Sequence, residues 1–339
     1  MRYSRRDFGK MALAGTVVTM AARKPDSEFG GVQIGIITYS FRALPGSAEE
    51  TLKYCVECGI SGIELMSSVA ESYAGGPVQP GRGFGPGGGP PSGAARPAGT
   101  PGRPEGGRPR LTPEQQAAME KAAEEMKQWR LSVSMDKYKA FRKMYNDAGV
   151  EIYAFKLPPT MRMSDEEYAY IWNVAETLGA THVTMELPTD DALLARVAGY
   201  AATRRLPIAF HTHGQGGSSG FDKALGASKY TALNLDVGHY YGVTGESPIP
   251  IIEKYQDRIA SLHLKDRKGP SGASGGPGGG GPNMPWGQGE TPLREILQLM
   301  KKRKHRFPAS IEYEYTTPEG SDVLTEIKKC VQFCKDALA

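Results

Sequence analysis

The sequence predicts an α/β protein built as a single (β/α)8 barrel of the TIM type. Apolar, strand-like segments alternate with helix-like segments along the chain, and eight such pairs follow one another. The strand-like segments are short and nearly continuously apolar, which is typical of parallel strands buried on both faces. An open doubly wound sheet is the alternative, but no Gly-x-Gly-x-x-Gly turn follows the first strand.

The first half of the chain supplies four of these pairs. We predict strands over residues 33–40, 60–66, 150–157 and 181–187. The helices that follow them are predicted over residues 47–59, 111–149, 164–179 and 190–205. The helix over 164–179 has an acidic first turn and ends at a glycine, which is a common pattern at helix ends.

The second half supplies the strands that carry chemistry. They are predicted over residues 208–214, 233–239, 259–266 and 309–315, with helices near residues 221–228, 247–255, 291–304 and 321–338. Each of these strands has a metal-binding type of residue near its end, and these residues are His211, Asp236, His263 and Glu312. Because the carboxyl ends of barrel strands meet on one face, the four side chains are predicted to form a metal site.

The mixture of ligand types indicates which metal would bind. Imidazole and carboxylate ligands without a thiolate favour Mn²⁺ or Zn²⁺, with Co²⁺ and Fe²⁺ as alternatives, and leave positions open for substrate oxygens. Four of the six histidines lie in these segments, which argues against scattered structural histidines. His213 shares a strand face with His211, and Lys265 shares one with His263. His239 follows Asp236 closely enough to reach the same site.

Residues 1–22 are predicted to be a twin-arginine signal peptide. Arg5 and Arg6 precede a moderately apolar run that is too short for a comfortable membrane span, since a span needs about 20 residues. We therefore expect a periplasmic protein whose barrel covers residues 30–339, with an amphipathic N-terminal helix as the alternative. The same segment holds most of the net charge of +4, so no nucleic-acid partner is indicated.

Two Gly/Pro-rich stretches interrupt the barrel pattern, at about residues 74–110 and 269–282. Each follows a strand, so both are predicted to be loops on the face that carries the site. Long loops in this position often act as lids. A disordered insertion without a catalytic role is the alternative.

Four cysteines lie in the first and last predicted helices, which are neighbours in a closed barrel. They are Cys55, Cys58, Cys330 and Cys334. The spacing within each pair places both thiols on one helix face. They are predicted to be small buried residues, with a disulfide or a structural zinc as alternatives.

Five short segments together resemble the xylose-isomerase-like barrel group, which holds sugar and sugar-phosphate isomerases and epimerases and an apurinic-endonuclease branch. The segments are HTHG at 211–214, DVGH at 236–239, RIASLHLKD at 258–266, WGQGE at 286–290 and IEYE at 311–314. The resemblance covers about residues 33–335 and is specific for the group rather than for a substrate. Several relatives of this fold dimerise, so a homodimer remains an open alternative.

The resemblance implies that Asp236, His263 and Glu312 are metal ligands on the sixth, seventh and eighth strands. His211 stands where the group commonly has a glutamate. Epimerases of the group often use two metal-bound glutamates as acid and base, and here only Glu312 keeps its place. Glu186, at the end of the fourth strand, is predicted to supply the second carboxylate.

Contacts to substrate are expected from four side chains. The resemblance implies that His239 contacts substrate beside the metal and that His213 is a second inward histidine. Lys156 ends the third strand, where it is a candidate contact to a sugar hydroxyl or carbonyl, with a surface lysine as the alternative. Lys265 is also predicted to bind substrate.

These expectations describe a metal-dependent sugar isomerase or epimerase that removes a proton next to a carbonyl through an enediolate. Glu312, Glu186 and His239 are the candidate bases, in that order. The main alternative is a lyase that cleaves 3-keto glycosides by β-elimination at the same site. An endonuclease is disfavoured because the second to fourth strands have no histidine near their ends. A sugar-binding barrel without turnover is the non-enzymatic alternative.

Overall fold

A computed structural model describes residues 24–77, 112–213, 218–270 and 280–339 of the chain. The predicted signal peptide lies outside these residues, as do most of the two Gly/Pro-rich stretches, for which a lid and an insertion without a catalytic role were both left open. Along the part of the chain that is described, no helix has both the length and the apolar character needed to cross a membrane.

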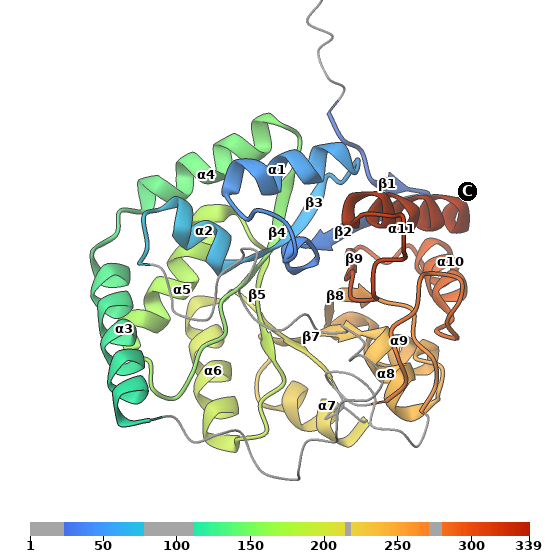
Figure 1. The fold of residues 1–339 in the computed structure, drawn as a ribbon. Helices are drawn as coiled ribbons and strands as arrows, with labels where there is room; N and C mark the ends of the chain where they lie inside the picture. Colours follow the sequence, from blue (N-terminus) through green and yellow to red (C-terminus); the bar gives the residue numbers. More distant parts are fainter. Residues whose placement is uncertain (1–23, 78–111, 214–217, 271–279) are drawn as a thin grey trace, which may run out of the picture.

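Eight parallel strands close into a barrel, as predicted (Figure 1). They are β2 (Val32–Ile37), β3 (Gly62–Met66), β4 (Glu151–Lys156), β5 (His182–Glu186), β6 (Ile208–His211), β7 (Thr231–Asp236), β8 (Ile259–Leu264) and β9 (Ala309–Ile311). Each strand pairs with the next along the chain, and β9 pairs with β2 to complete the ring. A short strand, β1 (Glu28–Phe29), adds to β2 in antiparallel fashion.

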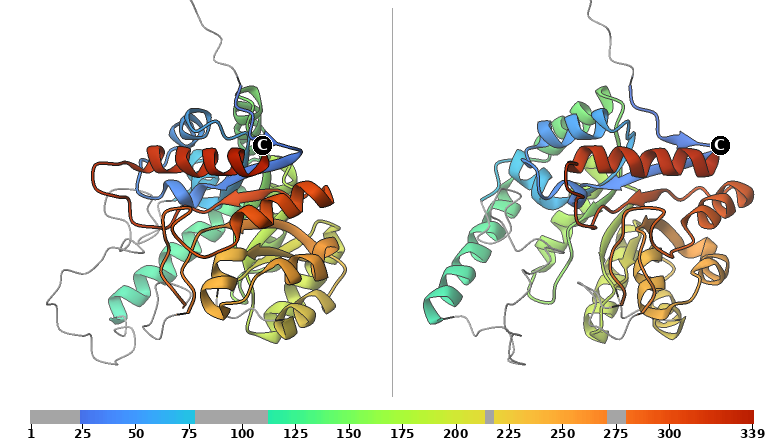
Figure 2. Two further views of the ribbon diagram at one scale, coloured as in Figure 1. Left: turned by 90° about the vertical axis from the view of Figure 1, so that its right-hand side faces the viewer. Right: turned by 45° about the vertical axis from the view of Figure 1, so that its right-hand side comes forward.

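Helices surround the barrel on its outer side (Figures 1 and 2). They are α1 (Ala48–Glu57), α2 (Ser67–Tyr73), α3 (Pro113–Ser132), α4 (Met135–Asp147), α5 (Asp165–Leu178), α6 (Asp191–Arg204), α7 (Ser218–Gly226), α8 (Val237–Thr244), α9 (Ile249–Tyr255), α10 (Leu293–Arg303) and α11 (Val323–Leu338). Two 3-10 turns, η1 (Thr38–Phe41) and η2 (Gln256–Arg258), complete the set.

The helical region predicted over 111–149 consists of two helices. Val133 closes α3 in an extended conformation, and Ser134 begins α4 by accepting a hydrogen bond from the backbone N–H of Asp136. An N-cap serine is a strong start signal in the middle of a helical pattern. The predicted helical region is therefore confirmed, and it comprises two helices joined by one turn.

Strand β7 ends earlier than predicted. The segment over 233–239 was expected to be a strand whose end turns into a loop near Asp236 and His239, but Asp236 is the last strand residue and also the N-cap of α8. Its Oδ1 accepts a hydrogen bond from the backbone N–H of His239 at 2.7 Å. The helix turn brings His239 back over the barrel mouth, which an extended strand would not do.

Strand register places the polar ends of several strands at one level. Glu186 pairs with His211 across β5 and β6, and Asp236 pairs with His263 across β7 and β8. Buried hydrogen bonds from Thr184 and Asn234 to Glu64 also join strands, whereas apolar side chains of strands and helices form one large core cluster. The polar layer therefore lies at the carboxyl end of a packed barrel.

The four cysteines lie at the contact between α1 and α11. Lys328 on α11 donates to Glu57 on α1 at 2.7 Å, which confirms that the first and last helices are neighbours. All four thiols are free and buried, and they belong to no metal-binding group among the described residues. The structure therefore favours the buried, apolar role over the disulfide and zinc alternatives.

Candidate metal centre

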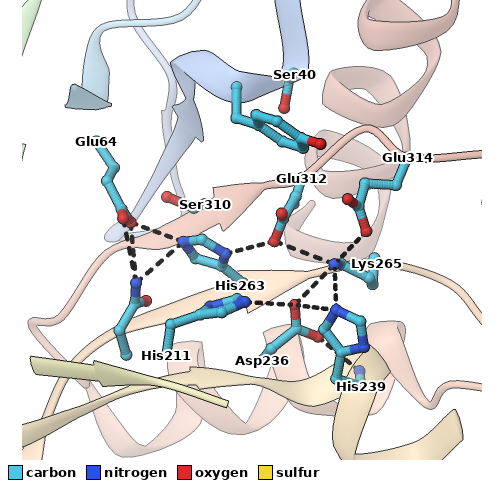
Figure 3. Close-up of polar contacts among 12 residues, drawn as sticks. Ser40, Glu64, His211, Asp236, His239, His263, Lys265, Ser310, Glu312 and Glu314 are labelled. Atoms are coloured by element: carbon cyan, nitrogen blue, oxygen red, sulfur yellow. Dashed lines mark hydrogen bonds and ion pairs between the residues drawn. The ribbon is translucent and has the colours of Figure 1, made fainter. Parts of the chain in front are cut away.

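The four residues predicted as metal ligands come together at the carboxyl end of the barrel (Figure 3). One ligand atom from each of His211, Asp236, His263 and Glu312 lies within 4.8 Å of the others. All four side chains are buried, and Glu312 follows directly after β9. The convergence that strand order predicted is thus present in the fold.

His263 is held between two carboxylates. Its Nδ1 lies 2.6 Å from Glu312 Oε2, and its Nε2 lies 2.7 Å from Glu64 Oε2. Burial alone would lower the pKa of His263, but the charges of Glu64 and Glu312 raise it to about 10. The histidine therefore carries a proton on both nitrogens, and a metal would take the place of the proton on the Glu312 side.

Glu64 on β3 was not assigned a role from the sequence. It is fully buried and accepts hydrogen bonds from Thr184 at 2.7 Å and from Asn234 at 3.1 Å. Burial raises the pKa of Glu64, but His263 and Lys156 outweigh it and lower the pKa to about 2. A carboxylate behind a ligating histidine fixes the ring and its tautomer. The only sequence signal was one acid within an apolar strand.

Lys265 places its ammonium group among the carboxylates (Figure 3). Its Nζ lies 3.1 Å from Asp236 Oδ2, 3.2 Å from Glu312 Oε2 and 2.6 Å from Glu314 Oε2. Burial opposes the charge, but these three carboxylates raise the pKa of Lys265 above its ordinary value. The predicted substrate contact therefore serves first as an internal counter-ion beside the candidate ligands.

His239 lies between two cationic side chains. Its Nε2 is 2.9 Å from Lys265 Nζ, and its Nδ1 is 2.6 Å from Arg267 Nη1. Burial and the charge of Lys265 hold the pKa of His239 well below its ordinary value. The ring is therefore neutral. Arg267, which is fully buried, was not singled out from the sequence.

The remaining predicted residues form the more open edge of the site. Lys156 donates to Glu186 Oε1 at 3.0 Å, and His213 Nε2 lies 3.5 Å from Glu186 Oε2. The Lys156 side chain is 11% exposed, which rules out a surface lysine. Glu186 and His213 are about two-fifths exposed. The structure thus groups these three residues with one another at the rim.

The residues present fit a divalent cation. Asp236 Oδ2, which faces Lys265 Nζ at 3.1 Å, and His211 Nδ1 are buried and make no hydrogen bond within the described part of the chain, so both could serve as ligand atoms. Five carboxylates, from Glu64, Glu186, Asp236, Glu312 and Glu314, face three permanent cations, from Lys156, Lys265 and Arg267. Once a metal takes the place of the His263 Nδ1 proton, the histidines are neutral and two negative charges remain, which a divalent ion would balance.

A sequence model of the family described as "Xylose isomerase-like TIM barrel" matches residues 117–334, well over half of the chain. The chain belongs to the xylose isomerase-like TIM barrel family. No curated protein sequence matches it.

Solved structures agree with this family assignment at the level of the fold. The probable 3-DHS dehydratase AsbF of Bacillus anthracis aligns with a TM-score of 0.56 and 15% identity, over 88% of this chain and 97% of that one. A xylose isomerase domain protein of Alicyclobacillus acidocaldarius aligns with a TM-score of 0.57 and 12% identity, over 90% of this chain and 99% of that one. The 3-keto-D-glucoside 4-epimerase of E. coli aligns with a TM-score of 0.53 and 10% identity, over 90% of this chain and 99% of that one.

This xylose isomerase-like barrel departs from the expected pattern at the end of β6. His211 replaces the commonly expected glutamate there, and its ring centroid lies 4.6 Å from that of His263. A second group of possible ligands, His211, His213 and His239, meets beside the first. The two groups share His211, so their relation decides how many cations the mouth of the barrel can hold.

Proposed function

We propose that the protein is a metal-dependent sugar isomerase or epimerase. The observation that carries this proposal is the buried His211–Asp236–His263–Glu312 set, which lies beside the carboxylate and lysine groups of the barrel rim. Solved structures of this fold include an L-ribulose 3-epimerase and a D-psicose 3-epimerase crystallised in the presence of D-fructose. Both names describe proton transfer at a carbon next to a carbonyl.

The ion would be held by those four side chains, with Mn²⁺ or Zn²⁺ best suited to the donors and Co²⁺ or Fe²⁺ as alternatives. When bound, it supplies a Lewis acid that polarises a carbonyl and stabilises negative charge on the adjacent oxygens. Glu64 would keep the Nε2 proton of His263 in place, which leaves Nδ1 free to act as the ligand.

Glu186 is the best-placed base of the three candidates. Its side chain is about two-fifths exposed at the rim, where Oε1 accepts from Lys156 and the buried Oε2 lies 3.5 Å from His213 and makes no hydrogen bond within the described residues. Glu312, in contrast, is buried, and although burial raises its pKa, Lys265 and His263 bring that pKa well below its ordinary value. A strongly stabilised carboxylate is a weak base. We therefore assign proton removal to Glu186 and a ligand role to Glu312.

A free or keto sugar is the substrate class that fits this charge pattern. Lys156 and Lys265 are each paired with carboxylates within the described residues, so neither is available to neutralise a phosphate. Hydroxyl and carbonyl groups need only hydrogen bonds from such a site. Export to the periplasm, which we propose from residues 1–22, agrees with an unphosphorylated substrate.

β-Elimination of 3-keto glycosides is the second candidate, and His211 favours it. Since His211 occupies the place of a glutamate, the centre lacks the pair of metal-bound carboxylates that epimerisation on two faces often uses. Elimination needs one base and one proton donor for the leaving group. Glu186 could fill the first role and a neutral histidine the second.

The test combines metal analysis with deuterium exchange from D₂O into a panel of keto sugars and 3-keto glycosides, followed by NMR. We expect bound transition metal and exchange next to the carbonyl in the purified protein. Asp236→Ala and His263→Ala should abolish both, whereas Asp222→Ala, on the exposed face of α7, should change neither. Full exchange in the chelated protein or in either ligand variant would refute the proposal.

A further inference from the structure

His239 has a hydrogen-bond donor on each side of its ring. Arg267 Nη1 lies 2.6 Å from Nδ1, and Lys265 Nζ lies 2.9 Å from Nε2. A neutral imidazole has one N–H and one lone pair, so it can accept from only one of these two cations. The identity of the accepting nitrogen fixes what His239 presents to the barrel mouth.

Arg267 is the donor that the structure fixes in place. Its Nε and Nη2 both donate to the carbonyl oxygen of Gly281, at 2.9 and 2.6 Å, which orients the planar guanidinium with Nη1 toward His239. The side chain passes directly over α8 at Gly242, where a Cβ would lie 2.9 Å from Arg267 Nε. A guanidinium has no lone pair to offer and stays protonated, so Nδ1 has to accept.

Lys265, in contrast, has no need of His239 as an acceptor. Its Nζ donates to Glu314 Oε2 at 2.6 Å and lies within 3.2 Å of the carboxylates of Asp236 and Glu312, which can accept from it in place of the ring. The ammonium group of Lys265 can therefore rotate away from the ring. The planar guanidinium of Arg267, in contrast, is fixed by its two hydrogen bonds to the carbonyl oxygen of Gly281.

From this geometry we propose that Arg267 is a positioning residue that locks His239 in the tautomer with its proton on Nε2. The Nε2–H then points into the site as a hydrogen-bond donor. A ring whose Nδ1 accepts from Arg267 and whose Nε2 carries the proton has no lone pair left. His239 is consequently neither a base nor a metal ligand, and the His211, His213 and His239 group does not hold a second cation.

This assignment gives His239 a role in the proposed reaction, and to that extent it rests on the proposed function. The Nε2–H would donate to the substrate oxygen on which negative charge develops, or to the oxygen of a leaving group. Removing one such donor from an active site typically lowers kcat by about 10²–10³-fold.

Two-bond ¹⁵N–¹H correlation NMR of the chelated full-length protein tests the tautomer without reference to activity. His239 is assigned by the signals that His239→Gln removes. We expect a protonated-type Nε2 and an unprotonated-type Nδ1 in the wild type and in Arg267→Lys, which retains a donor. Arg267→Met should shift the ring toward Nδ1–H, because Lys265 then becomes the donor to Nε2.

Gly242→Ala provides a second variant that leaves every polar side chain of the site unchanged. Its Cβ would displace the guanidinium, and the same shift toward Nδ1–H is expected. A protonated Nδ1 in the wild type would overturn the proposal, even if Arg267→Met fails to fold. So would an unchanged tautomer in a folded Arg267→Met protein.

The role toward substrate is tested by a matched pair of variants in the deuterium-exchange panel. The amide nitrogen of His239→Gln lies near the place of Nε2 and keeps a donor there, whereas the shorter His239→Asn does not. We expect kcat to fall by roughly 100-fold more in the second variant than in the first. Equal losses would overturn the donor role, whereas absent metal and absent wild-type exchange would overturn the proposed function and leave the NMR result standing.

Discussion

Replacing Glu64 by glutamine should weaken metal binding although Glu64 is not one of the four candidate ligands. The carboxylate accepts from Thr184 at Oε1 and from His263 at Oε2, at 2.7 Å in both cases. In Glu64→Gln the amide oxygen is expected at the Oε2 position, where His263 and Asn234 both donate, because the Thr184 hydroxyl can accept from the NH₂ group instead. The ring then keeps its Nε2 proton but loses the negative charge behind it.

The expected size of the effect follows from this loss of charge. Loss of a carboxylate behind a ligating histidine typically lowers metal affinity by about 10–100-fold, or roughly 1.4–2.7 kcal/mol. Because the amide oxygen keeps a hydrogen bond to the ring, we expect the lower end of that range.

Isothermal titration calorimetry with Mn²⁺ and Zn²⁺ into the chelated protein measures this affinity. Glu186→Gln is the matched control, since it removes one carboxylate charge at the same end of the barrel without touching His263. We expect the control to bind within about threefold of the wild type, because a partly exposed charge acts weakly through water. Equal affinities of Glu64→Gln and the wild type would refute the reasoning.

Three further predictions concern the scaffold. Burial lowers the pKa of His182 from 6.5 to about 4, so the unfolded chain takes up a proton at a higher pH than the folded one. Between pH 6.5 and 4 the free energy of unfolding of the chelated wild type, measured with urea, should therefore fall by about 3 kcal/mol more than that of His182→Gln. Parallel pH profiles of the two proteins would contradict this. Burial raises the thiol pKa of Cys58 and Cys330 to about 12, so a thiol reagent at pH 8 should label them only when the protein unfolds. Rapid labelling of the native protein would contradict this and show that the thiols are accessible. Arg130 donates to the buried Glu71 at 2.8 Å, so Arg130→Met should lower the free energy of unfolding by about 3–5 kcal/mol, whereas a loss below 1 kcal/mol would mean that water reaches the carboxylate.

Local sequence patterns predicted the barrel well because its rules are local. Each strand is a short apolar run, and parallel strands that alternate with helices have few ways to pack. The same rules gave less detail where one residue redirects the chain. Ser134 divides the predicted long helix, and Asp236 ends β7 by capping α8. In both cases a single capping hydrogen bond outweighed the periodicity of the surrounding residues.

The sequence by itself determined which residue types stand at the ends of the strands. Barrel closure brings all strand ends to one face, so His211, Asp236, His263 and Glu312 could be grouped without knowledge of any distance. Their charge and chemistry then limited the class of metal. This inference needed only the order of the elements and the ligand preferences of the side chains.

Only the tertiary structure decided what each of these groups can do. Glu64 and His263 are 199 residues apart, and barrel register alone brings them within 2.7 Å. The path of Arg267 past α8 likewise sets the acceptor nitrogen of His239. The proton positions and pKa values of buried rings depend on which donors and acceptors surround them. Those partners come from distant parts of the chain, and no local pattern encodes their geometry.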